Sequence, residues 1–197
     1  MSRLSRGALD VRRMLVASSH VAARLAEESP EWVETVARVM VKTLRSGGAV
    51  YYCGNGGSAA ESQHMAAELC GRFYKDRRPL NAASLTVNTS ALTALGNDYD
   101  YSEVFSRQVT AYGRRGDILV GISTSGKSKN VIEAFKVARR KGMITVGLTG
   151  GKGRGMARYC DHIYAIPSED VARIQEGHTL INHALCARAE AILFPGI

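Results

Sequence analysis

The 197-residue sequence has no long apolar run and only four cysteines, and each shortage excludes a class of protein. No stretch approaches the ~20 consecutive apolar residues that a helix needs to cross a bilayer, so a membrane span is not expected. The cysteines are far apart and form no CxxC pair, which argues against a zinc finger or a disulfide framework. Met1–Arg13 has basic residues but lacks the apolar core of a secretory signal, so we expect a cytoplasmic protein.

The sequence also lacks the pattern of a nucleic-acid platform. The formal net charge is +8, yet the basic residues are scattered, and no segment interleaves them with aromatic residues. A solvated basic surface is therefore the first interpretation, phosphate ligands are the second and nucleic acid is the third. Linkers, low-complexity tracts and solenoid-length repeats are absent too, so we expect a single domain over residues 1–197.

What the sequence contains is an alternation of short apolar strands with helical segments. Such an alternation predicts parallel βαβ units, and hence a three-layer αβα fold with a sheet covered on both faces. The strands are expected at residues 49–53, 83–87, 118–122, 144–148 and 162–166.

Three further helices exceed what this sheet needs for cover. Two amphipathic stretches at 7–27 and 31–46 precede the first strand, with Pro30 suited to the first turn of the second helix. A long helix is expected from Val171 to Phe194, before Pro195. Their spare apolar faces predict self-association as a dimer or tetramer through residues 1–47.

Two loops of small residues follow the first and third strands. Gly54–Ser58 leads into a helix expected over Ala59–Tyr74, where glycine allows close approach of a ligand and the helix N-terminus offers free N–H groups. Ser58 is equally a plausible N-cap. Ser123–Ser128 has four hydroxyl residues in six, more than capping requires. Both loops fall at the carboxyl edge of a parallel sheet, so they predict a bound anion, most simply a sugar phosphate.

The helix after the first loop carries groups able to do chemistry. His64 and Glu68 are four residues apart and share one helix face about 6 Å apart along the axis. Such a pair is a surface ion pair, a metal site or an acid–base pair. Its position after a phosphate loop favours the last two.

The last helix carries Gln175, His178 and His183. Helical geometry places Gln175 and His183 about 80° apart around the axis and ~12 Å apart along it. Both reach one small ligand only if their side chains lean toward each other. Otherwise they serve sites shared between subunits. His178 is rotated away from His183, and we expect it to be structural.

These motifs identify a resemblance. The Ser-rich loop resembles that of the sugar isomerase (SIS) family, and the whole set resembles the phosphoheptose isomerases (sedoheptulose-7-phosphate isomerases) within it over nearly the full chain. The motifs that carry the resemblance are Cys53–Ser58, Gln63–Leu69, Gly96–Tyr99, Ser123–Ser128 and Arg173–Glu176.

The resemblance implies a five-stranded parallel, flavodoxin-like sheet preceded by two helices, a homotetramer, and one zinc ion per subunit. Glu68 and His183 are then the expected catalytic residues, and His64, Glu68, Gln175 and His183 the expected metal ligands. Family members often carry aspartate where this chain has Glu61, so no role is carried over to Glu61. The expected substrate-binding residues are Asn55, Gly56, Gly57, Ser58, Glu68, Asn97, Asp98, Ser123, Thr124, Ser125, Ser128 and Gln175.

The implied reaction is the conversion of sedoheptulose 7-phosphate to D-glycero-D-manno-heptose 7-phosphate through an enediol(ate), the first step of ADP- or GDP-heptose formation for lipopolysaccharide or capsule. The principal alternative is a non-enzymatic DiaA-like regulator that binds the replication initiator DnaA. Such regulators lack an acid matching Glu68 and a histidine matching His183, whereas this chain has both. A DNA-binding sugar-phosphate sensor would need an added helix-turn-helix domain.

Overall fold

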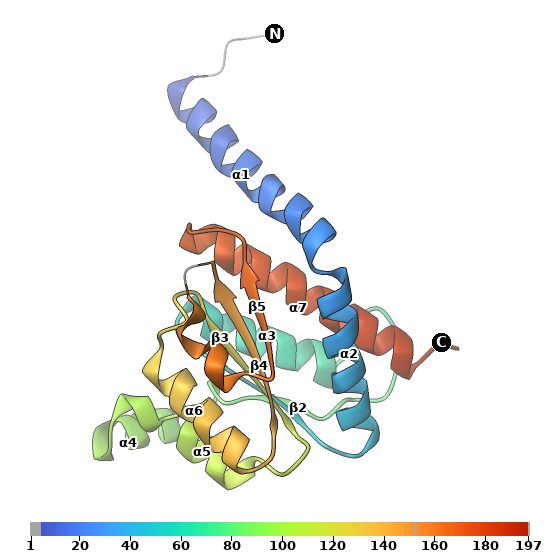
Figure 1. Cartoon of the computed structure of the whole chain (residues 1–197), viewed down its shortest axis with the longest axis vertical. Coiled ribbons are helices and arrows are strands. Elements are labelled where there is room, and N and C mark those ends of the chain that lie inside the picture. Colours follow the sequence, from blue (N-terminus) through green and yellow to red (C-terminus); the bar gives the residue numbers. More distant parts are fainter. Residues whose placement is uncertain (1–4, 152, 197) are drawn as a thin grey trace.

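In the computed structural model, which describes residues 5–151 and 153–196, a central parallel sheet is flanked by helices on both faces (Figure 1). Its five strands are β1 (Val50–Gly54), β2 (Ala82–Ser84), β3 (Ile118–Ser123), β4 (Ile144–Gly150) and β5 (His162–Ile166). They pair in the order β2-β1-β3-β4-β5, which is the flavodoxin-like order that the resemblance implied. All six residues of β3 are buried, as expected of a central strand covered on both faces.

Two apolar clusters, one on each face of the sheet, hold the three layers together. One face packs against α1 (Arg6–Glu28), α2 (Pro30–Arg45), α3 (Gly57–Cys70) and α7 (Val171–Leu193). The other is covered by α5 (Ser106–Tyr112), α6 (Lys129–Arg140) and the 3₁₀ turn η2 (Arg154–Tyr159). The helix α4 (Thr89–Asp98) and the turn η1 (Tyr101–Glu103) lie at the margin of this second layer (Figure 1).

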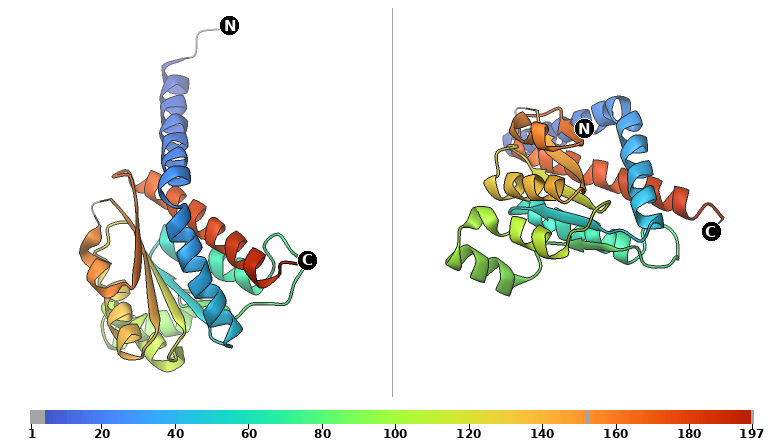
Figure 2. Two further views of the ribbon diagram at one scale, coloured as in Figure 1. Left: turned by 45° about the vertical axis from the view of Figure 1, so that its right-hand side comes forward. Right: turned by 60° about the horizontal axis from the view of Figure 1, so that its bottom comes forward.

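The helix α1 extends well beyond the sheet (Figures 1 and 2). Val21 and Leu25, in its C-terminal half, are buried, whereas apolar side chains in its N-terminal half, such as Met14 and Leu15, are exposed. Pro30 occupies the first turn of α2, as predicted. Within residues 5–151 and 153–196, no helix has both the length and the apolar character needed to cross a membrane.

Two predicted boundaries were wrong by three or more residues. The helix after the first loop ends at Cys70 rather than Tyr74, because Gly71 leaves the helical conformation with ψ at −116°. The strand predicted at 83–87 ends at Ser84, since the Ser84 and Thr86 hydroxyls bond to each other and Asn88 already caps α4.

Cys53, Cys160 and Cys186 behave as apolar packing groups, whereas Cys70 is exposed. All four are unpaired, and Cys53 is wholly buried in β1. Burial raises the pKa of the Cys53 thiol well above its usual range, and burial next to Asp161 raises the pKa of Cys160 to about 12. These two thiols are protonated, which is consistent with the expected packing role.

Candidate active site

The two small-residue loops lie side by side because β1 and β3 are neighbours in the sheet. The strand order reverses direction at this pair, since β2 lies on one side of β1 and β3 lies on the other. Ligands of open α/β sheets bind outside the carboxyl ends of the strands at such a point. The topology therefore brings both predicted loops to one location.

The first loop turns sharply into α3. Gly56, with φ at +55°, occupies the N-cap position, and the helix begins at Gly57. The N-cap interpretation of Ser58 was therefore wrong: the positive φ of Gly56 starts the helix earlier and places Ser58, 5% exposed, in the first turn. The approach is close, because a Cβ on Gly54 would lie 2.7 Å from the Ser58 carbonyl oxygen. This turn presents the N-terminal N–H groups of α3 at the sheet edge.

The second loop keeps its hydroxyl groups at the same edge. The Ser123 and Ser128 hydroxyl oxygens lie 2.8 Å apart, and the Ser125 hydroxyl accepts the Lys127 N–H over 3.2 Å. Ser128 stands at the N-cap of α6, yet in this described helix its side chain makes no capping bond. Capping thus does not account for the hydroxyls. Thr124 and Ser125 line a cleft of about 290 Å³.

A reciprocal amide pair joins the two loops. Asn55 Nδ2 donates to Asn130 Oδ1 over 2.9 Å, and Asn130 Nδ2 donates back to Asn55 Oδ1 over 2.8 Å. The Tyr101 hydroxyl also donates to Asn55 Oδ1, over 3.4 Å. Asn130 is buried in the first turn of α6, and sequence reasoning did not single it out. All three residues line a second cleft, of about 390 Å³.

The predicted chemical groups of α3 and α7 converge. His64 Nε2 lies 3.1 Å from Glu68 Oε1, and the rings of His64 and His183 meet edge to face with centroids 5.0 Å apart. One ligand atom from each of these three residues lies within 4.8 Å of the others. Side-chain exposures of 43% for His64 and 25% for Glu68 leave the cluster open to a ligand. A carboxylate beside two imidazoles can move protons or bind a cation.

Glu61 supports this cluster from α3. Its two carboxylate oxygens accept hydrogen bonds from the Thr179 hydroxyl and from Asn182 Nδ2 on α7, each over 2.9 Å. Glu61 Oε2 also lies 3.8 Å from His64 Nδ1. The carboxylate is therefore fixed between α7 and the imidazole of His64, on the side opposite Glu68.

Gln175 reaches the first loop rather than leaning along α7 toward His183. A Cβ on Gly57 would lie 2.7 Å from Gln175 Nε2, so the amide rests on the loop backbone. Gln175 and His64 line one cleft of about 450 Å³ between α3 and α7. His64 therefore lies next to both residues: it shares this cleft with Gln175, and its ring contacts that of His183. On α7 alone, Gln175 and His183 are far apart.

Three residues that the sequence analysis named lie away from the cluster of His64, Glu68 and His183. Asn97 and Asp98 are exposed at the end of α4, where Asn97 Nδ2 donates to Asp98 Oδ1 over 2.9 Å, and neither lines the three clefts described above. His178 is 1% exposed, and its Nε2 donates to the Thr149 carbonyl oxygen over 3.2 Å. This contact supports the structural role expected of His178.

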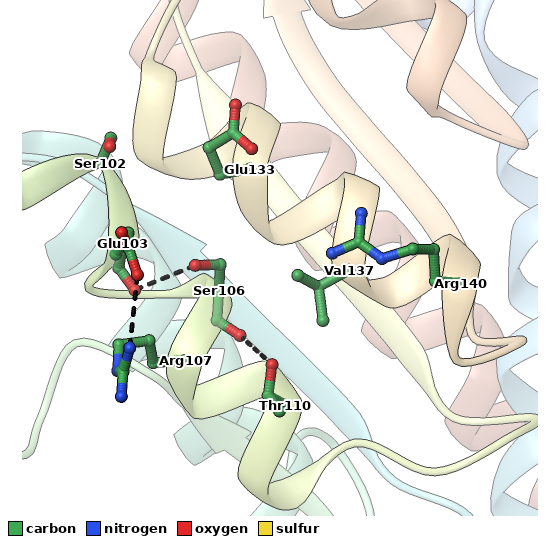
Figure 3. Close-up of a pocket in the computed structure, with 8 residues that line it drawn as sticks. All are labelled: Ser102, Glu103, Ser106, Arg107, Thr110, Glu133, Val137 and Arg140. Atoms are coloured by element: carbon green, nitrogen blue, oxygen red, sulfur yellow. Dashed lines mark hydrogen bonds and ion pairs between the residues drawn. The ribbon is translucent and has the colours of Figure 1, made fainter.

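A larger groove, of about 490 Å³, lies between α5 and α6, away from the cluster (Figure 3). Its hydroxyls are engaged within the protein, since Ser106 and Thr110 donate to backbone carbonyl oxygens. Arg107 is paired with Glu103 and Glu133 with Lys136, and Arg140 also lines the groove. Most of the polar side chains of this groove are therefore bonded to neighbours within the protein.

Comparison with known proteins identifies the family. Residues 15–150 match the family model of the SIS domain. The phosphoheptose isomerase of Rhodospirillum rubrum is 47% identical over 184 residues, which are 93% of this chain and 97% of that protein. This chain belongs to the phosphoheptose isomerase family. It is accordingly an enzyme, a sugar-phosphate isomerase.

Solved structures agree with the fold. The phosphoheptose isomerase of Neisseria gonorrhoeae is 43% identical with a TM-score of 0.87, over 92% of this chain and 97% of that one. That of Francisella tularensis is 35% identical with a TM-score of 0.90, over 94% and 98%. The phosphoheptose isomerase fold therefore extends over nearly the whole chain.

In this phosphoheptose isomerase family member, the cluster of His64, Glu68 and His183 offers the kinds of ligand atom that zinc prefers. Imidazole nitrogen and carboxylate oxygen bind zinc at about 2.0–2.2 Å, which places tetrahedral ligands roughly 3.4 Å from one another. The ligand atoms of His64, Glu68 and His183, all within 4.8 Å, need only side-chain adjustment to reach that spacing. Gln175 lines the adjoining cleft together with His64.

Proposed function

We propose that this enzyme interconverts sedoheptulose 7-phosphate and D-glycero-D-manno-heptose 7-phosphate. The observation that carries the proposal is the convergence of His64, Glu68 and His183 beside two loops suited to a phosphate. Relatives about half identical in sequence bear the name phosphoheptose isomerase, which supports the seven-carbon substrate.

The reaction moves a proton between C1 and C2 and another between their oxygens. Glu68 is the proposed base that removes the C1 proton of the ketose and returns it at C2, with an enediolate in between. His183 is the proposed group that delivers a proton to the C2 oxygen and accepts one from the C1 oxygen. Glu68 also borders the sugar in this scheme, so it is both a binding and a catalytic residue.

The loops supply the remote grip that orients the reacting end. The proposed phosphate contacts are the hydroxyls of Ser123, Thr124, Ser125 and Ser128, together with the N–H groups that follow Asn55. Binding energy at the phosphate and at the sugar hydroxyls fixes C1 against Glu68. Asn97 and Asp98 stay substrate-binding predictions, and a neighbouring subunit is the route by which they would reach a site.

One zinc ion per subunit, held by His64, Glu68, Gln175 and His183, is part of the proposal. When bound, zinc polarises the carbonyl group as a Lewis acid. Depletion with a chelator followed by zinc addition tests it: we expect activity to fall and return. Activity that persists after depletion, with zinc absent by elemental analysis, would leave catalysis to Glu68 and His183 alone.

Assembly and pathway extend the proposal. Large apolar side chains are exposed along α1, including Leu9, Val11, Met14 and Leu15. An interface between subunits would bury them, which supports the proposed homotetramer. In this proposal, the isomerisation is the first step of ADP- or GDP-heptose formation. The regulator alternative is disfavoured, because Glu68 and His183 are both present and face one cluster.

The test is turnover of sedoheptulose 7-phosphate beside five- and six-carbon ketose phosphates. We expect turnover of the heptose, and a loss of about 10²–10⁴-fold in kcat for Glu68→Gln. Glu133→Gln, which changes an exposed carboxylate of α6, is the control. Ligand binding without turnover of any of these sugars would favour the regulator, and near wild-type kcat in Glu68→Gln would remove Glu68 as the base.

A further inference from the structure

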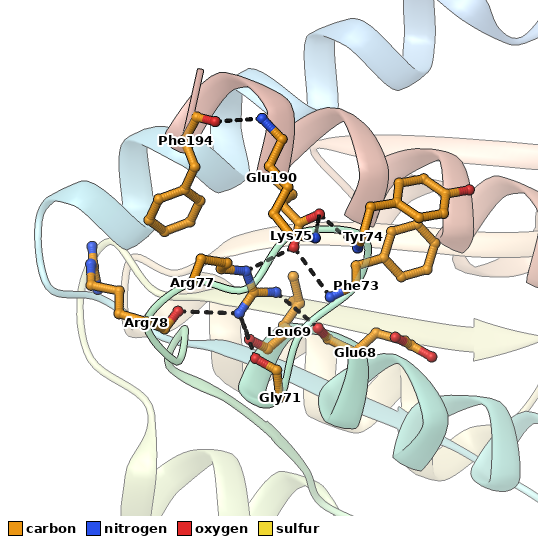
Figure 4. Close-up of polar contacts among 10 residues, drawn as sticks. All are labelled: Glu68, Leu69, Gly71, Phe73, Tyr74, Lys75, Arg77, Arg78, Glu190 and Phe194. Atoms are coloured by element: carbon orange, nitrogen blue, oxygen red, sulfur yellow. Dashed lines mark hydrogen bonds and ion pairs between the residues drawn. The ribbon is translucent and has the colours of Figure 1, made fainter. Parts of the chain in front are cut away.

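A buried ion pair connects α3 and α7, the two helices that carry the cluster, at a place away from the cluster itself. Arg77 Nε donates to Glu190 Oε1 over 2.9 Å, and the side chains are 0% and 1% exposed. Arg77 lies in the irregular segment 71–81 that follows α3, and Glu190 lies near the end of α7 (Figure 4). The pair therefore connects the end of the helix that carries Glu68 to the helix that carries His183.

Arg77 holds the C-terminal end of α3. Its Nη1 donates to the carbonyl oxygens of Leu69 and Gly71, each over 2.8 Å, and its Nη2 donates to the carbonyl oxygen of Glu68 over 3.0 Å. The last carbonyls of a helix have no partner within it, and a cation is favourable beside them. The guanidinium thus fixes the backbone of Glu68 directly.

Glu190 holds the segment that follows α3. Besides Arg77, its oxygens accept three backbone N–H bonds at 2.8–3.2 Å, from Phe73, Tyr74 and Lys75. Burial raises the pKa of Glu190, but these donors and the guanidinium outweigh that effect and lower the pKa overall. Four N–H donors meet two oxygens, so a carboxylate fits and an amide would set its NH₂ against two donors.

The segment held by Glu190 reaches His183. The Phe73 ring packs on the His183 ring with centroids 5.5 Å apart, and Glu190 accepts the backbone N–H of that same Phe73. One side of the ion pair therefore fixes the backbone of Glu68, and the other fixes the aromatic ring against which His183 rests.

We propose that Arg77 and Glu190 are positioning residues for the isomerisation, and that their ion pair sets the placement of Glu68 relative to His183. The catalytic roles of Glu68 and His183 rest on the proposed function. The geometric claim, that the pair seats these two side chains, does not depend on the substrate.

The test compares Glu190→Gln with Glu34→Gln. The control removes the exposed ion pair between Glu34 and Arg188, which also involves α7 but touches neither α3 nor the segment 71–81. We expect Glu190→Gln to lose about 10- to 100-fold in kcat, because small displacements of catalytic groups are costly. KM is expected to change by less than about twofold, since the phosphate loops are untouched. The control is expected to keep both constants.

A purely structural role would lower the melting temperature and the folded fraction of Glu190→Gln but leave kcat per folded molecule unchanged. That result would overturn the proposal. If Glu190→Gln does not fold, Arg77→Lys takes its place, since lysine keeps the charge but cannot reproduce the fork of donors to three carbonyl oxygens.

A second readout is independent of turnover. The NMR resonances of the His183 ring are shifted by the ring current of Phe73, so they report the seating of His183. In the folded variant we expect them to move toward their positions in Phe73→Leu, and to stay in place in Glu34→Gln. Failure of the wild type to turn over any sugar phosphate would defeat the proposed function only. His183 resonances unchanged in the folded variant would defeat the positioning role.

Discussion

Gly126 is the residue of the second loop at which one added methyl group tests the loop geometry most sharply. Its φ is +62°, and a Cβ there would lie 1.5 Å from the Gly153 carbonyl oxygen. The left-handed conformation costs an alanine roughly 1–2 kcal/mol. Real Cβ atoms do not approach a heavy atom closer than 3.0 Å. In a closely packed interior, the segments that contain Gly126 and Gly153 must therefore move roughly 1.5 Å farther from each other.

That separation moves the hydroxyl groups of the loop. The Gly126 N–H donates to the Ser123 carbonyl oxygen over 3.0 Å, and the Gly153 carbonyl oxygen accepts the Thr149 hydroxyl over 2.9 Å, so the displacement is passed on to Ser123 and Thr149. Losing a hydrogen bond to a charged group such as a phosphate costs about 1.5–3 kcal/mol. For Gly126→Ala we therefore expect binding of sedoheptulose 7-phosphate to weaken about 100-fold, or about 2.7 kcal/mol.

Gly116→Ala is the matched control. Gly116 has φ at +86°, no described atom outside its own neighbours within 4 Å of an added Cβ, and a position at the opposite, amino end of β3. Urea unfolding should show a loss of roughly 1–2 kcal/mol in Gly116→Ala from the backbone conformation, and a larger loss in Gly126→Ala, because overpacking adds to it. Isothermal titration with the sugar phosphate should show the loss of affinity in Gly126→Ala alone. Equal affinities in the two variants would refute the reasoning.

Three further predictions concern the core, the pH dependence of stability and the support of His64. Gly121→Ala places a Cβ 2.5 Å from Phe135 Cζ, and this overpacking should cost about 1–3 kcal/mol in urea unfolding, whereas Gly7→Ala, in open space, should not show it. Burial lowers the pKa of His178 from 6.5 to about 4, against the opposing effect of its bond to the Thr149 carbonyl. Between those values the unfolded chain binds a proton that the folded chain does not, so stability should fall as pH drops from 6.5 to 4, by at most about 1.4 kcal/mol per pH unit. His178→Gln should flatten that part of the urea profile, and parallel profiles would contradict the assignment. Glu61→Gln should weaken binding of the proposed zinc ion about 10- to 100-fold in a chelator competition, because Glu61 faces Nδ1 of His64. Affinity equal to that of Glu133→Gln would leave Glu61 without this role.

The sequence was enough to predict the fold and the sheet edge at which the two small-residue loops meet. Apolar runs such as residues 118–122 mark a buried parallel strand by composition, and small-residue loops directly after two of them fall at one sheet edge by topology. The pair of His64 and Glu68 could be predicted because its spacing lies within one helix.

The remaining features depend on contacts between residues distant in the chain. Arg77 and Glu190 are separated by 113 residues, and Asn55 and Asn130 by 75, so no local pattern pairs them. Ser58 was assigned as an N-cap because hydroxyl residues prefer that position, but the positive φ of Gly56 decided the helix start. Helix periodicity alone also separated Gln175 from His183, which His64, on another helix, brings into one arrangement.

The amide pair of Asn55 and Asn130 has a consequence for the kinetics of ligand capture. Because each side chain satisfies the other before any ligand arrives, the two loops are ordered together during folding rather than during binding. The entropy lost in fixing them therefore belongs to the stability of the fold and does not subtract from affinity. A sugar phosphate should then associate at a rate set by encounter, with no slow phase for loop closure, and differences in affinity among ligands should arise in their rates of departure.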